Sequence, residues 1–282
     1  MKVFESLKNK VFIITGGAGA GAGGTGAEIA KRLCENGAYS VIWDIAVKPG
    51  KELVQELQNE GKEALFIHCD VRDENEVKRA LAKTMSVYGK VNGLVNNAFW
   101  HSDIQPPLHE MTLEDWDEHI SINLRCHFIV CKYVIPVLLK QKESVILNIG
   151  STGAQRGEDG YFAYDAAKAG LESLTRNIAA QYGREGLRCN CLVPGLIFSE
   201  KYEAVLSENP EARHVFGKMD RNNLLFCGHG TGSKAADAAL FMLSDMSDYI
   251  TTQTLVLDGG TISHCPQWAD LRDANNNKKE DF

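Results

Sequence analysis

The sequence lacks the features that mark several large classes of protein. Its 30 lysines and arginines stand against 37 aspartates and glutamates, and no stretch clusters basic residues that could neutralise a run of phosphates. Its eight cysteines form no CxxC pair and have no histidine partners at the spacing of a tetrahedral metal site. We therefore expect neither nucleic acid nor a metal as a ligand, and we interpret the cysteines as small buried thiols of a reducing compartment.

Long apolar runs and flexible linkers are also missing. The run from Val11 to Ile14 is too short for a signal sequence or a membrane span, so we expect a cytoplasmic protein without a membrane partner. No internal repeat and no linker rich in Pro, Gly or Ser interrupts the 282 residues. We therefore predict a single domain over residues 1–282, with a substrate lid at 196–232 and a polar tail at 261–282.

Short β-branched runs alternate with longer amphipathic segments along the chain. The predicted strands are Val11–Thr15, Ser40–Asp44, Ala64–His68, Val91–Asn96, Ser144–Ile149, Leu187–Val193 and Thr254–Leu257. The predicted helices are Gly26–Asn36, Glu74–Tyr88, Leu113–Lys140, Tyr161–Tyr182 and Lys234–Leu243. This alternation predicts an α/β fold, a Rossmann-like doubly wound parallel sheet of about seven strands with helices on both faces. Ligands of such folds bind beyond the carboxyl ends of the strands.

A glycine-rich turn, Thr15 to Gly26, follows the first strand and opens directly into a helix. Glycines let the backbone approach an anion, and the free N–H groups of the first helical turn point at it. The position between a buried strand and a helix favours a pyrophosphate-binding loop over a flexible loop without a ligand.

Acidic residues end the second and third strands. Asp44 could accept hydrogen bonds from both adenosine ribose hydroxyls, and its charge would repel a 2′-phosphate. No Lys or Arg occurs in the glycine loop or beside Asp44 before Lys48, so NAD is favoured over NADP. The alternative is that Asp44 only caps a turn. Asp70 and Val71 could hold the adenine, or Asp70 could be another cap.

A phenol and an amine lie one helical turn apart at Tyr164 and Lys168, on one face of a predicted helix. An adjacent ammonium favours the phenolate and should lower the pKa of Tyr164 from the usual value of about 10, which would let it exchange a proton with an alcohol or carbonyl oxygen. Alone, such a pair is more often a solvated surface pair. Ser151 strengthens the catalytic interpretation, because it ends the fifth strand and could hold the same substrate oxygen.

With these residues in this order, the sequence resembles the short-chain dehydrogenase/reductase family over about residues 8–260. The matching segments are Thr15-Gly16, Gly24-Thr25-Gly26, Asn96-Asn97-Ala98, Asn123, Ser151, Tyr164, Lys168, Pro194-Gly195 and Asp258-Gly259-Gly260. The resemblance implies an oxidoreductase that transfers a hydride between NAD(H) and a secondary alcohol or ketone. It also implies a homotetramer, with the helices at 113–140 and 161–182 at one interface.

The resemblance also assigns catalytic roles. Tyr164 would be the general acid/base, Ser151 would position the substrate oxygen, and Lys168 would bond the nicotinamide ribose and tune Tyr164. Asn123 would anchor a water in the proton relay. Together with the residues discussed above, the expected cofactor contacts are Thr15, Gly16, Gly24, Thr25, Gly26, Asp44, Asp70, Val71, Asn97, Ala98, Tyr164, Lys168, Pro194, Gly195, Ile197 and Ser199.

The sequence departs from the family pattern in two places. The glycine loop is longer than the family usually has, and Phe99 replaces the glycine that normally follows Asn-Asn-Ala. The residues expected near the pocket are mostly apolar and aromatic, which favours a hydrophobic, cyclic or hydroxysteroid-like substrate. The candidate substrate contacts are Phe99, His101, Gln155 and Tyr161.

Three alternatives remain open on the sequence alone. Tyr161 lies seven residues before Lys168, a spacing found in related enoyl reductases, which reduce a C=C bond. Such an enzyme would survive replacement of Tyr164 by Phe, whereas an alcohol dehydrogenase using Tyr164 would not. The chain could also be a non-catalytic NAD-binding regulatory protein. A scaffolding protein without a nucleotide is the third alternative, and it predicts no thermal shift with NAD.

Overall fold

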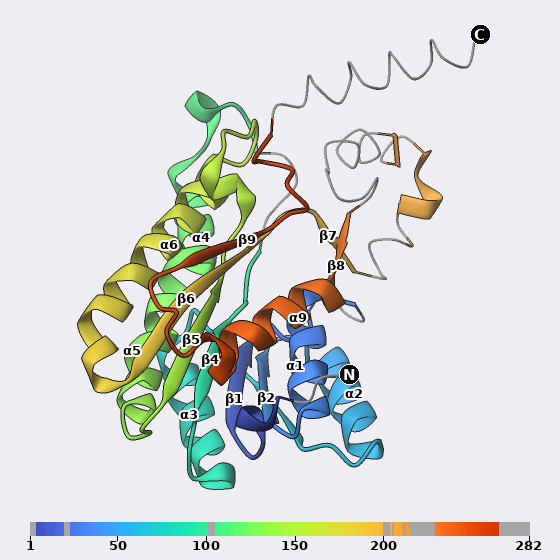
Figure 1. Ribbon diagram of the computed structural model, residues 1–282. Helices are drawn as coiled ribbons and strands as arrows, with labels where there is room; N and C mark the ends of the chain where they lie inside the picture. The colour runs from blue at the N-terminus through green and yellow to red at the C-terminus, as the bar shows by residue number, and fades with distance from the viewer. Residues whose placement is uncertain are drawn as a thin grey trace, which may run out of the picture.

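A seven-stranded parallel sheet forms the centre of the computed structural model, which describes residues 4–19, 23–100, 105–199, 204, 206–210, 213–214 and 229–264. The strand order is β3-β2-β1-β4-β5-β6-β9 (Figure 1). The strands are β1 (Val11–Thr15), β2 (Tyr39–Asp44), β3 (Ala64–His68), β4 (Gly93–Asn96), β5 (Ser144–Ile149), β6 (Leu187–Pro194) and β9 (Thr254–Leu257). The order reverses direction at β1 and β4, so the predicted doubly wound α/β fold is confirmed.

Helices cover both faces of this sheet (Figure 1). One face carries α1 (Thr25–Glu35), α2 (Val47–Asn59) and α9 (Gly232–Leu243). The other carries α3 (Glu74–Tyr88), α5 (Cys126–Leu138) and α6 (Phe162–Tyr182), with α4 (Leu113–Ile120) beside α6. Short 3-10 helices are η1 (Glu5–Leu7), η2 (Leu108–Glu110), η4 (Thr152–Gln155), η5 (Gly183–Glu185) and η6 (Asp245–Ser247).

The first strand shows why the central strands are apolar without interruption. Phe12 and Ile14 belong to the core under α1, α2 and α9, whereas Val11 and Ile13 belong to the core under α3, α5 and α6. Successive side chains of a strand point to opposite faces, and here both faces are covered by helices. All four side chains are consequently fully buried.

The stretch Leu113–Leu138 is long and apolar enough to cross a membrane by length and composition. It consists of α4, the π-helical turn η3 (Ser121–Arg125) and α5. Its residues Ile129, Val130 and Val134 are buried against the sheet in the second core, so packing in the fold accounts for the apolar composition. The predicted helix Leu113–Lys140 is therefore confirmed, with a π turn in its middle and an end at Leu138.

The segment predicted as a substrate lid begins with β7 (Ile197–Phe198), which pairs in parallel with β8 (Gly230–Thr231) near the other end of that segment. Residues 200–203, 205, 211–212 and 215–228 of the lid lie outside the described residues, as do residues 265–282 of the polar tail. The lid and the single-domain boundary stay predictions.

Candidate active site

The end of β5 and the start of α6 bring Ser151, Tyr164 and Lys168 together. The side chains of Ser151 and Tyr164 are hydrogen-bonded to each other. The Lys168 Nζ atom lies 5.6 Å from the centre of the Tyr164 ring and donates a hydrogen bond of 2.9 Å to the Ile149 carbonyl. The residues predicted to share one site therefore do so, at the carboxyl edge of the parallel sheet.

Burial dominates the electrostatics of this group. The Lys168 side chain is 1% exposed, and removal from water lowers its pKa to about 8. Burial raises the pKa of Tyr164 to about 12, although the hydrogen bond with Ser151 acts in the opposite direction. The lowering of the Tyr164 pKa that the spacing predicts is thus not found. Tyr164 therefore holds its proton at neutral pH.

Asp165 adds a second unusual group beside Tyr164. Its carboxyl packs directly against Gly153, at a place where a Cβ atom could not fit. Burial raises the pKa of Asp165 to about 7, the charge of Glu158 adds to the rise, and Arg156 opposes it. In the part of the chain that the structure describes, its Oδ1 atom is buried without a hydrogen-bond partner. The nearby Asp165 charge also contributes to the raised pKa of Tyr164.

Asn123 is fully buried in the π turn η3, between α4 and α5. Its Oδ1 atom accepts a hydrogen bond of 3.2 Å from the Trp100 backbone N–H, and its Nδ2 group donates 2.8 Å to the Trp100 carbonyl. The same Nδ2 group donates 3.1 Å to the His119 carbonyl. The side chain therefore clamps the backbone that follows β4. π turns of this kind often occur at functional sites.

The predicted substrate contacts separate into different positions. The centre of the Phe99 ring, which is 48% exposed, lies 5.9 Å from Lys168 Nζ, so two aromatic rings lie near the amine. Tyr161 is the residue that precedes α6, and its phenol lies close enough to Tyr164 for the two titrations to interact. The exposed Gln155 instead donates to Glu172 on α6 at 3.0 Å. His101 lies outside the described residues. Phe99 and Tyr161 thus share the site with Lys168 and Tyr164, and Gln155 is directed to the surface of α6.

The glycine turn docks onto the end of β4. Gly16 has a φ of +62°, and a Cβ atom there would come within 2.6 Å of the Ala98 Cα atom. Asn97 Nδ2 donates to the carbonyls of Gly16 at 2.7 Å and Thr15 at 3.1 Å. The Thr15 hydroxyl oxygen accepts from the backbone N–H groups of Asn97 and Ala98. These contacts explain why Thr15, Gly16, Asn97 and Ala98 occur together at this edge of the sheet.

The start of α1 fits an anionic ligand. Its N-cap residue is Gly24, which has no side chain to satisfy the free N–H groups of the first turn. At Gly26 a Cβ atom would come within 2.5 Å of Asn97 Nδ2, so only glycine leaves this floor open. Glycines that leave the backbone accessible and a helix start with free N–H groups together suit a pyrophosphate. The residues present therefore fit a dinucleotide.

Asp44 ends β2 and is 5% exposed. Its Oδ2 atom accepts from the backbone N–H groups of Ala18 at 2.8 Å and Gly19 at 2.9 Å, and its Oδ1 atom accepts from Ala46 at 2.8 Å. A carboxylate has about four acceptor positions. The backbone therefore occupies three of them, so Asp44 does cap the turn, the alternative that the sequence left open, and about one acceptor position is left for a ribose hydroxyl.

The remaining predicted cofactor contacts end β3 and β6. The Asp70 carboxylate pairs with Arg72 at 2.8 Å, and this hydrogen-bonded pair lowers the pKa of Asp70. Val71 is buried beside it. Gly195 follows β6 and donates from its backbone to the Leu257 carbonyl at 2.9 Å. The other predicted contacts at this end are Pro194, Ile197 and Ser199, which lie in or next to β6 and β7.

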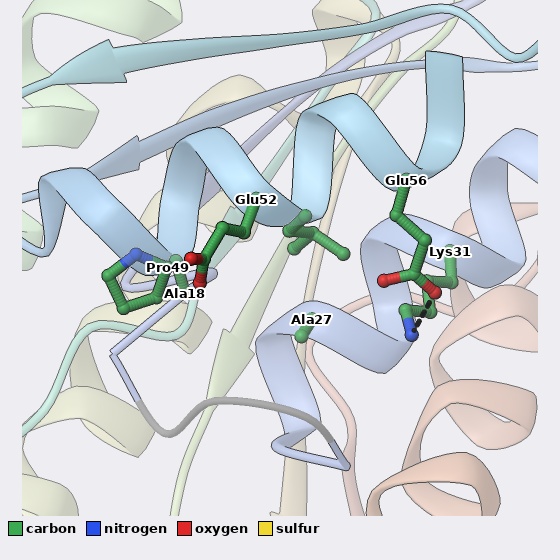
Figure 2. Close-up of a pocket in the computed structure, with 7 residues that line it drawn as sticks. Ala18, Ala27, Lys31, Pro49, Glu52 and Glu56 are labelled. Carbon is green, nitrogen blue, oxygen red and sulfur yellow. Dashed lines mark ion pairs between the residues drawn. The ribbon is translucent and has the colours of Figure 1, made fainter. Parts of the chain in front are cut away.

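A pocket of about 190 Å³ lies between α1 and α2, beside Ala18 of the glycine loop (Figure 2). Lys31 of α1 and Glu56 of α2 face each other across it and form an ion pair of 2.9 Å (Figure 2). Pro49 and Glu52 line its other end (Figure 2). None of the proposed proton-transfer residues lines this pocket. It therefore lies apart from Ser151, Tyr164 and Lys168.

Sequence reasoning missed two residues of the site, Gln105 and His119. Gln105 accepts a hydrogen bond from the backbone of Ala163, which immediately precedes Tyr164, and its amide contacts His119. His119 lies four residues before Asn123, so helical spacing could have placed it near the site. Gln105 lies in an irregular loop, where no periodicity indicates which way a side chain points.

Comparison with known proteins identifies the family. The family model described as enoyl-(acyl carrier protein) reductase matches residues 19–262. Over 255 residues the chain is 34% identical to 3-oxoacyl-[acyl-carrier-protein] reductase FabG of Chlamydia pneumoniae, with 90% of this chain and 98% of that protein covered. Over 261 residues it is 31% identical to 7alpha-hydroxysteroid dehydrogenase of Bacteroides fragilis, with 92% and 97% covered.

A solved structure supports the same assignment. The crystal structure of a protein from Burkholderia xenovorans, assigned to the short-chain dehydrogenases/reductases, matches with a TM-score of 0.84 and 31% identity, covering 93% of this chain and 99% of that chain. The chain belongs to the short-chain dehydrogenase/reductase family. It is an oxidoreductase that acts on CH–OH or C=O groups with a nicotinamide cofactor.

Proposed function

We propose that this enzyme interconverts a hydrophobic secondary alcohol and its ketone, cyclic or hydroxysteroid-like, with NAD(H) as cofactor. The observation that supports this proposal best is the convergence of Ser151, Tyr164 and Lys168 at one edge of the sheet. The glycine turn that fits a pyrophosphate lies at the carboxyl end of β1, on the same edge of that sheet. A proton-transfer group and a nucleotide cradle are what reversible alcohol oxidation requires.

The proposed roles follow from these contacts. When bound, the nicotinamide accepts or supplies the hydride. Tyr164 donates its phenolic proton to the carbonyl oxygen during reduction and takes the hydroxyl proton during oxidation. Ser151, already hydrogen-bonded to Tyr164, holds the same substrate oxygen. Lys168 supplies positive charge beside the phenol ring, which favours the phenolate once the proton has left. Asn123 holds the π turn and the Trp100 backbone at the edge of the site.

The choice of NAD over NADP rests on Asp44. Three backbone donors hold its buried carboxylate at the end of β2, so it is fixed in place. A 2′-phosphate would bring a second negative charge to this position. The nearest downstream cation, Lys48, is 86% exposed and lies 3.9 Å from Glu52. This arrangement favours an unphosphorylated ribose.

The proposed substrate class rests on the rings around the site. Phe99 and Trp100 are 48% and 43% exposed where the chain leaves β4, and the Phe99 ring contacts the side of Lys168. Exposed aromatic rings at an active-site entrance favour an apolar, flat substrate surface. The similarity to a 7alpha-hydroxysteroid dehydrogenase is consistent with such a substrate.

The test is a screen of secondary alcohols and ketones that follows the absorbance of reduced nicotinamide, with NAD and NADP compared in parallel. We expect turnover with NAD and a hydrophobic cyclic alcohol. Tyr164→Phe should abolish this turnover while leaving the dissociation constant for NAD unchanged. The matched control is Tyr161→Phe, which removes a hydroxyl from the same end of α6 and should retain activity. A strong preference for NADP would contradict the interpretation of Asp44.

A second candidate function is reduction of a C=C bond, with Tyr161 as the proton donor. The description of the matching family model favours it. Two contacts favour Tyr164 instead, its hydrogen bond with Ser151 and the position of Lys168 beside its ring. The same two variants separate the candidates, because an enoyl reductase would keep its activity in Tyr164→Phe and lose it in Tyr161→Phe.

We further propose that the enzyme is a cytoplasmic homotetramer whose subunits meet through α4, α5 and α6. Phe128 on α5 is 54% exposed, an apolar surface that a partner subunit would cover. The six cysteines of the described residues are buried thiols without disulfides, as a reducing compartment requires. Light scattering after size exclusion should give four chains, and Phe128→Glu should reduce that number.

A further inference from the structure

A buried glutamine connects the loop after β4 to the start of the catalytic helix. Gln105, 6% exposed, accepts a hydrogen bond of 3.2 Å at Oε1 from the Ala163 backbone N–H. Its own backbone N–H donates 2.8 Å to the Gly160 carbonyl. Its Nε2 atom lies 3.0 Å from Nε2 of His119, which is 2% exposed. We call these two side chains the Gln105–His119 strap.

The strap supplies a cap that α6 does not have of its own. The first N–H groups of a helix have no partner within the helix, and a side chain at the N-cap usually satisfies one of them. Tyr161 occupies the N-cap position of α6 and makes no side-chain cap hydrogen bond. Gln105 caps the helix from 58 residues away in the sequence. Because Ala163 is adjacent to Tyr164, this contact fixes the backbone that carries the phenol.

The contacts also determine how the two side chains are protonated. A backbone N–H can only donate, so the Gln105 oxygen must face Ala163 and the Gln105 NH₂ group must face His119. The His119 Nε2 atom is then the acceptor, and the ring is neutral with its proton on Nδ1. This assignment leaves both hydrogen-bonding atoms of the Gln105 amide satisfied inside the protein.

The strap extends to Asn123 through two further contacts of His119. The His119 carbonyl accepts from Asn123 Nδ2 at 3.1 Å, and the His119 ring lies 5.0 Å from the Trp100 ring. Trp100 is in turn clamped by both atoms of the Asn123 amide. The helices α4 and α6 lie side by side (Figure 1). The strap therefore joins the helix that leads to Asn123 with the helix that carries Tyr164.

We propose that Gln105 and His119 are positioning residues that set the place of Tyr164 relative to Asn123 and Phe99. Neither side chain needs to touch the substrate or the cofactor for this role. The inference rests on the proposed function of Tyr164 as the proton-transfer residue. Its consequence is that loss of the strap slows turnover without weakening the nucleotide half of the site, which is held by Asp44 and Asn97.

The experiment compares four variants of the full chain. Gln105→Met keeps the length of the side chain but removes the cap. Gln105→Glu keeps an oxygen that accepts from the Ala163 N–H, and its other oxygen can accept a hydrogen bond from His119 when the His119 proton moves to Nε2. His119→Phe keeps a ring against Trp100 but removes the acceptor. The control, Gln55→Met, removes an exposed amide that bonds Asn59 on α2. The readouts are kcat, KM, the dissociation constant for NAD, and hydrogen exchange of the amides at the start of α6.

We expect kcat to fall roughly 10- to 100-fold in Gln105→Met, because misplacement of a reacting group by up to about 1 Å has effects of this size. KM and NAD binding should change little, and hydrogen exchange at the start of α6 should accelerate. Gln105→Glu should restore most of the lost kcat, His119→Phe should give a smaller loss, and Gln55→Met should behave as wild type. Wild-type kcat in Gln105→Met, or no rescue by Glu, overturns the proposal.

Hydrogen exchange separates this inference from the proposed function, because it needs no turnover. If no alcohol, ketone or enoyl substrate reacts with the wild type, the proposed function fails, and accelerated exchange in Gln105→Met still demonstrates the cap. If turnover is found but exchange at the start of α6 is unchanged in Gln105→Met and His119→Phe, the strap does not hold the helix and the inference fails. NAD binding by each variant reports that it is folded.

Discussion

Replacing Asp165 by Asn should stabilise the protein at neutral and alkaline pH. The folded chain raises the pKa of Asp165 from 3.8 to about 7, chiefly by burial against Gly153. Between these two values the folded chain binds a proton that the unfolded chain has released. The free energy of unfolding therefore falls as pH rises through this window, and Asn, which cannot ionise, removes the loss.

The size of the effect follows from the two pKa values. Each factor of ten in proton affinity corresponds to about 1.4 kcal/mol, so a fully buried carboxyl would lose roughly 4 kcal/mol above neutrality. Asp165 is partly in contact with solvent and has Arg156 nearby, so screening reduces this limit to about 1–2 kcal/mol. Most of it should develop between about pH 4 and pH 7.

Urea unfolding of wild type and Asp165→Asn at these two pH values measures the effect directly. The difference between the two proteins should grow by about 1 kcal/mol from the lower to the higher pH. The exposed Asp117 of α4 provides the control Asp117→Asn, for which no such growth is expected. The variant should also oxidise alcohols faster at a given pH, because the Asp165 charge contributes to the raised pKa of Tyr164. A stability difference that is constant across pH would refute the reasoning.

Three further predictions concern the glycine turn, the ribose end and the buried amine. Gly16→Ala should lower the free energy of unfolding in urea by at least about 1–2 kcal/mol, because φ is +62° and the new Cβ atom would clash with Ala98. The control Gly61→Ala has a similar φ but open space around it, so it measures the contribution of the backbone conformation alone. Asp44→Asn should shift the ratio of kcat/KM values toward NADP, and an unchanged ratio would exclude Asp44 as the selecting residue. Lys168→Met should abolish turnover yet raise the free energy of unfolding by about 1–2 kcal/mol at neutral pH. That gain should shrink from about pH 8 to pH 10. In this range the folded wild type has released the Lys168 proton that the unfolded chain still binds, so the free energy of unfolding of the wild type rises with pH.

The fold could be predicted because its strands are apolar on both faces. A run such as Val11–Thr15 needs two covered faces, and only a sheet between two layers of helices provides them. The helix α2 is absent from the predicted helices because Pro49 and Gly50 interrupt its pattern. In the structure Pro49 lies in the first turn, where proline is tolerated, and Gly50 makes room for the Phe66 ring. Both residues are therefore compatible with α2, although each normally disfavours a helix.

In the candidate site, the residue positions that follow from a local spacing could be predicted. The pKa values that depend on burial could not. The i, i+4 spacing places Tyr164 and Lys168 on one face, and the structure places them there. The same spacing predicts a lowered pKa for Tyr164, and this prediction was wrong, because burial raises that pKa. The contact of Gln105 with Ala163 joins residues 58 apart through an irregular loop, and no local pattern encodes it.

The two halves of the site differ in how they are held, and this difference has a physical reason. Backbone groups hold the nucleotide half: Asp44 and Asn97 bond main-chain atoms of the glycine turn, which must stay close to an anion. Side chains form the proton-transfer half, where burial shifts the pKa values of Lys168 and Tyr164. Such groups destabilise the fold when they ionise, so their positions must be secured by contacts that do not titrate with them. The cap that Gln105 places on α6 is a contact of this kind, and it is therefore at the proton-transfer half that loss of one neutral hydrogen bond should affect the rate most.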